Sequence, residues 1–152
     1  GLVGNAAMLG TIGPLAHQGF DDWARVIRVN LLANIALLQA FDPPLRRHRG
    51  RLVFVTSGVA QMAKPYWSAY AASKAALEAA VRAYAGEHRK SGMAVNLLDP
   101  GIMRTRMRAE AFPGEDPNQL AAPEQLVPTV LQMLDPAFER NGEIIRINQR
   151  KR

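Results

Sequence analysis

Four short apolar segments, separated by stretches of helical periodicity, most constrain the fold of this chain of 152 residues. The segments are 2–6 (LVGNA), 51–57 (RLVFVTS), 93–98 (MAVNLL) and 142–148 (GEIIRIN). Runs of this length that are apolar at nearly every position are typical of strands buried on both faces of a parallel sheet. The alternation predicts an α/β fold, with helices packed on a parallel sheet.

Three helices are predicted between these strands, at 20–41, 68–90 and 123–134. The first has apolar residues at three- and four-residue steps, and Pro43 and Pro44 are predicted to end it. The second is rich in alanine and is predicted to end before Gly92. Pro128 predicts a kink or a late start in the third. Two long loops, 6–19 and 99–122, follow strands, where open α/β sheets bind ligands.

Composition narrows the classes of protein that fit. The chain has no cysteine, which excludes disulfides and thiolate metal sites, and its three histidines lack metal-ligand spacing. The formal charge is +6, but the arginine-rich stretches carry no aromatic platform or DNA-reading motif, so we interpret them as solvated faces. An anionic substrate or a phosphate-bearing cofactor is the alternative partner for them. We find no signal peptide and no apolar run near membrane-helix length, and expect a cytoplasmic protein.

The stretch YAASK places Tyr70 and Lys74 four residues apart on the second predicted helix. Residues at this spacing share a helix face, and a neighbouring ammonium favours the phenolate and lowers the pKa of a tyrosine. Ser57 lies at the end of an apolar strand, where its hydroxyl can hydrogen-bond the substrate oxygen with which Tyr70 would exchange a proton. Asn30 lies within the first helix, where asparagine is unfavourable unless it has a specific role.

With these residues in order, the chain resembles the short-chain dehydrogenase/reductase family. The matching motifs are GNAA (4–7), VNLLAN (29–34), VFVTSG (53–58), YAASK (70–74) and DPGIMRT (99–105). The resemblance implies the C-terminal part of a Rossmann-type, doubly wound parallel sheet with flanking helices. It also implies a nicotinamide cofactor, NAD or NADP, and a small-molecule carbonyl or alcohol substrate. The cofactor-binding positions it implies are Asn5, Ala6, Ala7, Tyr70, Lys74, Pro100, Gly101, Ile102 and Thr105.

The resemblance also assigns roles to four catalytic residues. Tyr70 would exchange a proton with the substrate oxygen, and Ser57 would orient and polarise that oxygen. Lys74 would lower the pKa of Tyr70 and hold the nicotinamide ribose. Asn30 would position a water molecule that relays protons to Lys74.

The chain departs from the family pattern at several places. Gly4 and Ala7 replace the first asparagine and the last glycine of the turn after the first segment. The ending IRINQRKR (145–152) replaces the usual Val-Asp-Gly-Gly. The glycine-rich pyrophosphate turn and the residue that selects NAD or NADP are missing from the sequence. We therefore expect a single partial domain, inactive by itself, with a bare apolar strand edge.

The substrate is only loosely indicated. Segment 103–122 would cover it, with Met103, Met107 and Phe112 lining an apolar pocket. Arg104 and Arg108 would share a helix face. They would either bind the phosphate of a 3-oxoacyl carrier thioester or form a solvated face of that helix. The sequence also resembles bacterial 3-oxoacyl-carrier-protein reductase-like members.

Several alternatives remain open. The chain could be an epimerase or dehydratase of the same superfamily, or a non-catalytic binding or assembly module.

A homo-oligomer is expected through helices 20–41 and 68–90, which resemble those that pair across the family's dimers. Glu78 and Glu87 are interpreted as residues on the solvent face of their helix, and Trp67 as a packing residue.

Overall fold

The computed structural model of the chain describes residues 1–62 and 64–147, and it contains a parallel sheet of four strands in the order β1-β2-β3-β4. The strands are β1 (Leu2–Gly4), β2 (Arg51–Val55), β3 (Ala94–Asp99) and β4 (Ile144–Arg146). Each falls inside a predicted segment or within one residue of it, so the α/β prediction is confirmed. The basic tail at 148–152 lies outside the described residues.

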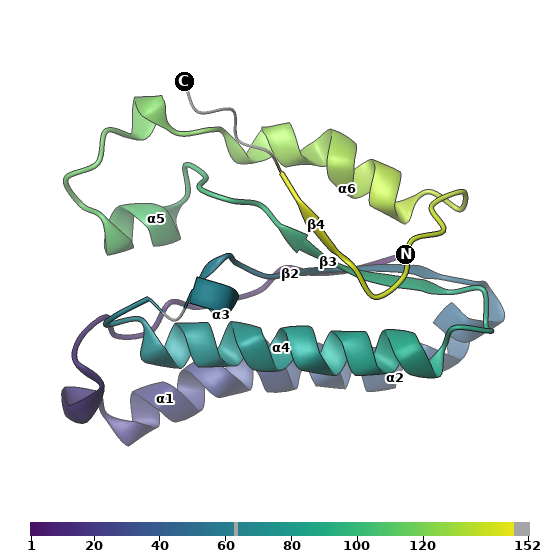
Figure 1. Cartoon of the computed structure of the whole chain (residues 1–152), viewed down its shortest axis with the longest axis horizontal. Coiled ribbons are helices and arrows are strands. Elements are labelled where there is room, and N and C mark those ends of the chain that lie inside the picture. Colours follow the sequence, from purple (N-terminus) through teal and green to yellow (C-terminus); the bar gives the residue numbers. More distant parts are fainter. Residues whose placement is uncertain (63, 148–152) are drawn as a thin grey trace.

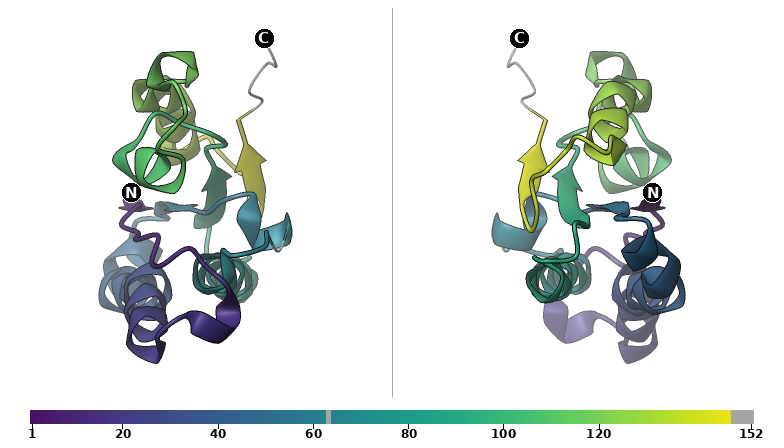
Figure 2. Two further views of the ribbon diagram at one scale, coloured as in Figure 1. Left: turned by 90° about the vertical axis from the view of Figure 1, so that its left-hand side faces the viewer. Right: turned by 90° about the vertical axis from the view of Figure 1, so that its right-hand side faces the viewer.

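Helices cover both faces of this sheet (Figures 1 and 2). The helices α1, α2 and α4 lie on one face, and α6 lies on the other. The helix bounds are α1 (Phe20–Ile27), α2 (Ala33–Arg47), α3 (Val59–Met62), α4 (Ser68–Glu87), α5 (Arg106–Ala111) and α6 (Val127–Leu134). A π-helical turn, Arg28–Leu32, joins α1 to α2, and 3₁₀ turns lie at Leu15–His17, Pro117–Gln119 and Pro123–Leu126.

The two faces of the sheet bury alternate residues of the same strands. Leu52 and Phe54 of β2 pack in the core under α2 and α4, whereas Val53 between them packs toward α6 with Leu98 and Met133. Successive side chains of a strand point to opposite faces, so a strand covered on both faces must be apolar at consecutive positions. This is the physical basis of the continuous apolar runs in the sequence.

The first helix does not end before the two prolines as predicted. The helix α2 continues through Pro43 and Pro44 to Arg47, and both prolines are exposed. Leu45, which is 9% exposed, packs in the core under the sheet. We attribute the continuation to burial of Leu45, because tertiary packing supplies most helical stability and offsets the backbone hydrogen bonds that two prolines remove.

The third helix confirms the late start predicted from Pro128. Residues Pro123–Leu126 form a 3₁₀ turn, and α6 begins at Val127 with Pro128 in its first turn. Proline is tolerated there because that N–H has no intrahelical acceptor. The second helix, predicted to reach residue 90, ends at Glu87, and Gly92 adopts a left-handed φ of 78° in the turn that follows.

Because the prolines do not end it, the helical run Phe20–Arg47 extends over 28 residues and is long and apolar enough, by length and composition, to cross a membrane. Such a run is also typical of a core helix. Here Val26 and Asn30 are fully buried, and the run contacts α4. Its other side leaves Phe20, Leu32 and Phe41 exposed.

Candidate active site

The candidate active site lies where the carboxyl ends of β1, β2 and β3 meet at one edge of the sheet. In-register parallel pairing aligns Gly4 with Phe54 and Val55 with Leu98, so the residues that follow these strands are brought together. They are Asn5 after β1, Ser57 after β2 and Pro100 after β3. Ligands of open α/β sheets bind at this edge.

Tyr70 lies in the first turn of α4 with its side chain largely buried, 8% exposed. Burial raises the pKa of Tyr70 above its usual value, a hydrogen bond between the Ser57 hydroxyl and the phenol lowers it, and the Asp99 carboxylate raises it further. The structure thus brings together the predicted phenol and hydroxyl.

Lys74 lies one turn further along α4 and is 2% exposed. Its Nζ donates to the carbonyl oxygen of Val55, at 2.8 Å, and lies 5.9 Å from the centre of the Tyr70 ring. Burial lowers the pKa of Lys74 to about 8. The expected lowering of the Tyr70 pKa by Lys74 is not seen here, because the amine faces the end of β2 and burial dominates the phenol.

Asn30 lies in the π turn and is fully buried. Its side chain accepts from the Met8 N–H at 2.8 Å and donates to the Met8 carbonyl at 2.9 Å and to Ser73 Oγ at 3.0 Å. The extra residue of a π turn frees a backbone carbonyl, and the Asn30 carbonyl accepts from Asn34 Nδ2 at 2.9 Å. The Asn30 amide therefore fixes the loop after β1 to α4.

Packing explains why Gly4 stands where the family turn has an asparagine. A Cβ at Gly4 would lie 2.3 Å from Phe54 Cδ1 and 2.5 Å from Asn34 Oδ1. Only glycine fits beside these side chains, and Phe54 belongs to the main core. Of the next residues, Asn5 and Ala6 are exposed and Ala7 is half-buried, so the first two are open to a ligand.

The loop after β3 also follows its predicted course along the sheet edge. Gly101 adopts a φ of 67°, in the left-handed region that favours glycine. Its N–H donates to Asp99 Oδ1 at 3.1 Å, and Ile102 is 45% exposed. The Thr105 oxygen accepts from Arg108 N–H at 3.1 Å and caps α5, which leaves the hydroxyl proton for a ligand.

Two polar features of the site were not predicted. Thr56 Oγ1 donates to Glu78 Oε1 at 2.8 Å, and the two residues are 2% and 5% exposed. The interpretation of Glu78 as a solvent-facing residue is therefore wrong. Lys74 and Glu78 lie one helical turn apart and bind the consecutive residues Val55 and Thr56, so α4 holds the strand end that carries Ser57.

Asp99 is the second of these features. Its carboxylate raises the pKa of Tyr70, accepts from the Gly101 N–H at 3.1 Å, and would lie 3.5 Å from a Cβ at Gly58, the residue after Ser57. An acidic residue directly before the Pro-Gly pair was the signal in the sequence. Strand alternation points Thr56 away from Ser57, which agrees with its bond to Glu78.

The arginines of the covering segment do not share a helix face as predicted, because α5 begins at Arg106 and leaves Arg104 outside it. Arg108 makes hydrogen bonds of 2.5 and 2.7 Å to both carboxylate oxygens of Glu115. Such a bidentate pair occupies the guanidinium. Met107 packs against the cluster of Leu9, Val59 and Tyr70, and Met103 is buried; that these residues line a substrate pocket stays a prediction.

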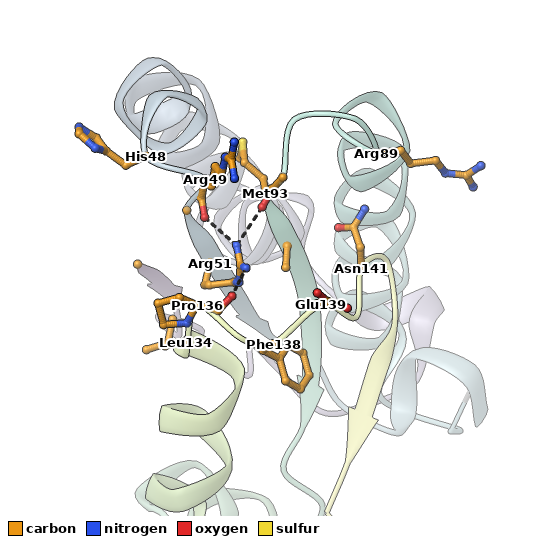
Figure 3. A pocket seen from close by; sticks show the side chains of 14 residues that line it. His48, Arg49, Arg51, Arg89, Met93, Leu134, Pro136, Phe138, Glu139 and Asn141 are labelled. Atoms are coloured by element: carbon orange, nitrogen blue, oxygen red, sulfur yellow. Dashed lines mark hydrogen bonds between the residues drawn. The ribbon is translucent and has the colours of Figure 1, made fainter.

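A pocket of about 910 Å³ lies at the opposite, amino-terminal ends of β2 and β3 (Figure 3). The Arg51 guanidinium there donates to the carbonyls of Arg49 at 2.6 Å and Gly92 at 3.0 Å, and to that of Pro136. These three acceptors belong to separate connections between elements. We interpret Arg51 as a structural link between them, remote from the edge that carries Ser57 and Tyr70.

The sequence matches the family described as short chain dehydrogenase over residues 1–116. YciK of Escherichia coli (strain K12), an uncharacterized oxidoreductase, is 39% identical over 135 residues, which cover 88% of this chain and 53% of YciK. Benzil reductase ((S)-benzoin forming) of Bacillus subtilis (strain 168) is 30% identical, covering 97% of this chain and 68% of its own length.

Solved structures give the same result. A short chain dehydrogenase from Escherichia coli CFT073, solved in complex with NADPH, matches with a TM-score of 0.89 and 38% identity, over 95% of this chain and 60% of that one. The short chain dehydrogenase from Shigella flexneri matches with a TM-score of 0.91 and 36% identity, over 99% and 59%. The chain thus spans somewhat over half the length of these proteins. On its motifs, its fold and these matches, the chain belongs to the short chain dehydrogenase family.

Proposed function

We propose that this chain carries the catalytic half of an NAD(P)-dependent oxidoreductase that interconverts a carbonyl and an alcohol on a small molecule. The observation that supports it best is the Tyr70 phenol, which shares a hydrogen bond with Ser57 at the carboxyl edge of a parallel sheet. A buried lysine with a pKa of about 8 lies one turn away. Family membership and the NADPH complex of a neighbour support the same reaction class.

The residues along the sheet edge fit the nicotinamide end of such a cofactor. Asn5 and Ala6 are exposed after β1, and Ile102 is exposed after β3. Their small or apolar side chains leave room for a flat ring, and the Thr105 hydroxyl proton can be donated to a carboxamide. When bound, the cofactor supplies the hydride, and the protein contributes geometry and electrostatics.

In the proposed mechanism, Tyr70 gives its phenolic proton to the carbonyl oxygen as that oxygen gains negative charge. Ser57 donates a hydrogen bond to the same oxygen and aligns it with the phenol. The raised pKa of Tyr70 keeps the phenol protonated, which suits a general acid in the reductive direction. Lys74 holds the end of β2, with its amine 5.9 Å from the centre of the Tyr70 ring.

The test uses the native gene product that contains this chain, assayed with NADPH or NADH and a panel of ketones. Tyr70→Phe should lower kcat by about 10²- to 10⁴-fold, the usual contribution of a positioned acid, with circular dichroism unchanged. Tyr66→Phe, a change at a 60% exposed tyrosine nearby, is the matched control and should keep activity. Normal turnover in Tyr70→Phe would refute the proposed mechanism.

The finer prediction of a 3-oxoacyl thioester substrate has less support. Its expected phosphate ligand, Arg108, is engaged by Glu115, and Arg104 alone lies exposed. Turnover of an acetoacetyl thioester at a kcat/KM well above that of simple ketones would establish it.

We also propose that the protein forms a homo-oligomer through the helical run Phe20–Arg47 and α4. The support is the exposed apolar side of that run, where Leu32 is 51% and Phe41 46% exposed. Light scattering after gel filtration of the native gene product gives the mass, and Phe41→Asp should shift it toward the monomer. A wild-type mass of one chain would contradict this proposal.

A further inference from the structure

The surroundings of the Tyr70 ring are apolar and aromatic, and they come from widely separated segments. Tyr70 clusters with Leu9 and Val59, and Trp67, Met107 and Ala111 pack against this group. These residues come from the loop after β1, from α3, from the start of α4 and from α5. A substrate whose carbonyl reaches the phenol must therefore place a substituent against apolar side chains.

Aromatic rings form a strip that leads from the phenol toward the covering segment. The Trp67 ring lies 6.0 Å from that of Tyr70 in an edge-on arrangement, at 75°. It lies 5.8 Å from Phe112 with an angle of 32° between the planes. Both Trp67 and Phe112 are only partly buried, so the strip retains surface that a ligand can contact.

Charged groups hold the outer ring of this strip in place. The guanidinium carbon of Arg108 lies 3.7 Å from the centre of Phe112, and Lys64 Nζ lies 4.5 Å from it. The same Nζ is 4.6 Å from the centre of Trp67. Because Glu115 fixes Arg108 in a bidentate pair, the ring receives a cation–π contact from a positioned partner.

The backbone beside Trp67 is also constrained. Tyr66 has a φ of 72°, a conformation that is uncommon for a bulky residue and often found at functional sites. Its carbonyl accepts from the Gly13 N–H at 3.0 Å, which ties this turn to the loop after β1. Trp67 is therefore presented toward Tyr70 by a turn with a fixed shape.

We infer that Trp67 and Phe112 are the specificity-determining residues, and that the substrate is a ketone bearing an aryl or similarly flat apolar group next to the reacting carbonyl. This inference rests on the proposed function. The flat group lies along the Trp67–Phe112 strip while the carbonyl oxygen meets Tyr70 and Ser57. Arg108 offers little to an anionic carrier group, since its charge is already matched by Glu115, and the ammonium of Lys64 lies over the two rings.

The experiment compares three substrates in the native gene product: 1-phenyl-1,2-propanedione, 2,3-butanedione and an acetoacetyl thioester. Wild type should prefer the aryl dione. Trp67→Ala should lower kcat/KM for the aryl dione by about 10- to 100-fold, the usual value of an apolar contact of this size, and change that for 2,3-butanedione by less than about threefold. Leu131→Ala, which truncates a side chain that is 63% exposed on α6, is the control and should change neither.

Phe112→Leu keeps an apolar side chain and removes only the ring, so it tests the inference even if Trp67→Ala fails to fold. It should lower the preference for the aryl dione over 2,3-butanedione by about three- to tenfold. An unchanged preference in the variants, or a wild-type preference for either other substrate, would overturn the inference. Loss of the proposed function gives a different result, because wild type would then turn over none of the three ketones and Tyr70→Phe would change nothing.

Discussion

The buried amine of Lys74 predicts a specific dependence of folding stability on pH. Burial lowers the pKa of Lys74 from 10.5 to about 8, so the unfolded chain binds this proton more tightly than the folded protein does. Where the unfolded state holds more protons, stability rises with pH. Folding therefore becomes more favourable as the pH rises through the window between about 8 and 10.5.

The size of this effect follows from the two pKa values. At pH 7 the lysine is protonated in both states, and its burial opposes folding by about 3 kcal/mol. At pH 9 that penalty falls to about 2 kcal/mol, and at pH 10 to about 1 kcal/mol. The side chain is 2% exposed, so solvent screening reduces these values little.

Lys74→Met removes this contribution and should flatten the pH dependence. Urea unfolding of wild type and variant at pH 7 and pH 10 gives the free energy of unfolding, and the wild-type gain should exceed the variant's by about 2 kcal/mol. The lost hydrogen bond to the Val55 carbonyl adds a nearly constant offset, so the comparison between the two pH values isolates the amine. Lys90→Met, at an exposed lysine, is the control for removal of an ammonium alone. Parallel curves for wild type and Lys74→Met would show that the amine titrates normally.

Three further predictions concern the packing around the site. Thr56→Val removes the shorter of the two hydrogen bonds to the buried Glu78 side chain and leaves only the 3.4 Å bond from Gln61 Nε2. It should destabilise by about 2–3 kcal/mol in urea unfolding, whereas the double variant with Glu78→Leu should recover most of this; equal losses would refute the pairing. Gly4→Ala should destabilise by about 1–3 kcal/mol, since its methyl overlaps Phe54, and an unchanged melting temperature would contradict that packing. Asn30→Ala should raise the hydrogen-exchange rate of the Met8 backbone amide well above the rates of the amides in α4. The reason is that the loop after β1 loses both of its hydrogen bonds to the Asn30 side chain.

The sheet was predictable because its signal is strong and local. Strands covered on both faces must be apolar at consecutive positions, and β2 satisfies this after Arg51, as β3 does except at Asn96 and the terminal Asp99. The motif spacing also placed Ser57 and Tyr70 correctly relative to each other, since both follow from strand and helix geometry. The sequence alone does not show the positions at which tertiary packing overrides a local signal.

Two places in the chain illustrate this limit. Pro43 and Pro44 are strong helix breakers, but burial of Leu45 beyond them keeps α2 helical. Glu78 has the composition of a surface position, but its partner Thr56 lies far along the chain and is brought to it only by the packing of α4 on β2. Such long-range polar pairs have no periodicity that a sequence can show.

The π turn at Arg28–Leu32 has a consequence for how this helical run tolerates change in length. It holds one residue more than an ordinary helical turn would, and each residue of a helix adds about 100° of rotation. Deleting a single residue here would restore regular winding and leave the downstream faces nearly unchanged, whereas a deletion in α2 before Leu38 would rotate everything beyond it by that angle. Leu38 and Leu45 would then leave the core together, so a deletion in α2 should be as harmful as the loss of several buried side chains, and one in the π turn much less harmful.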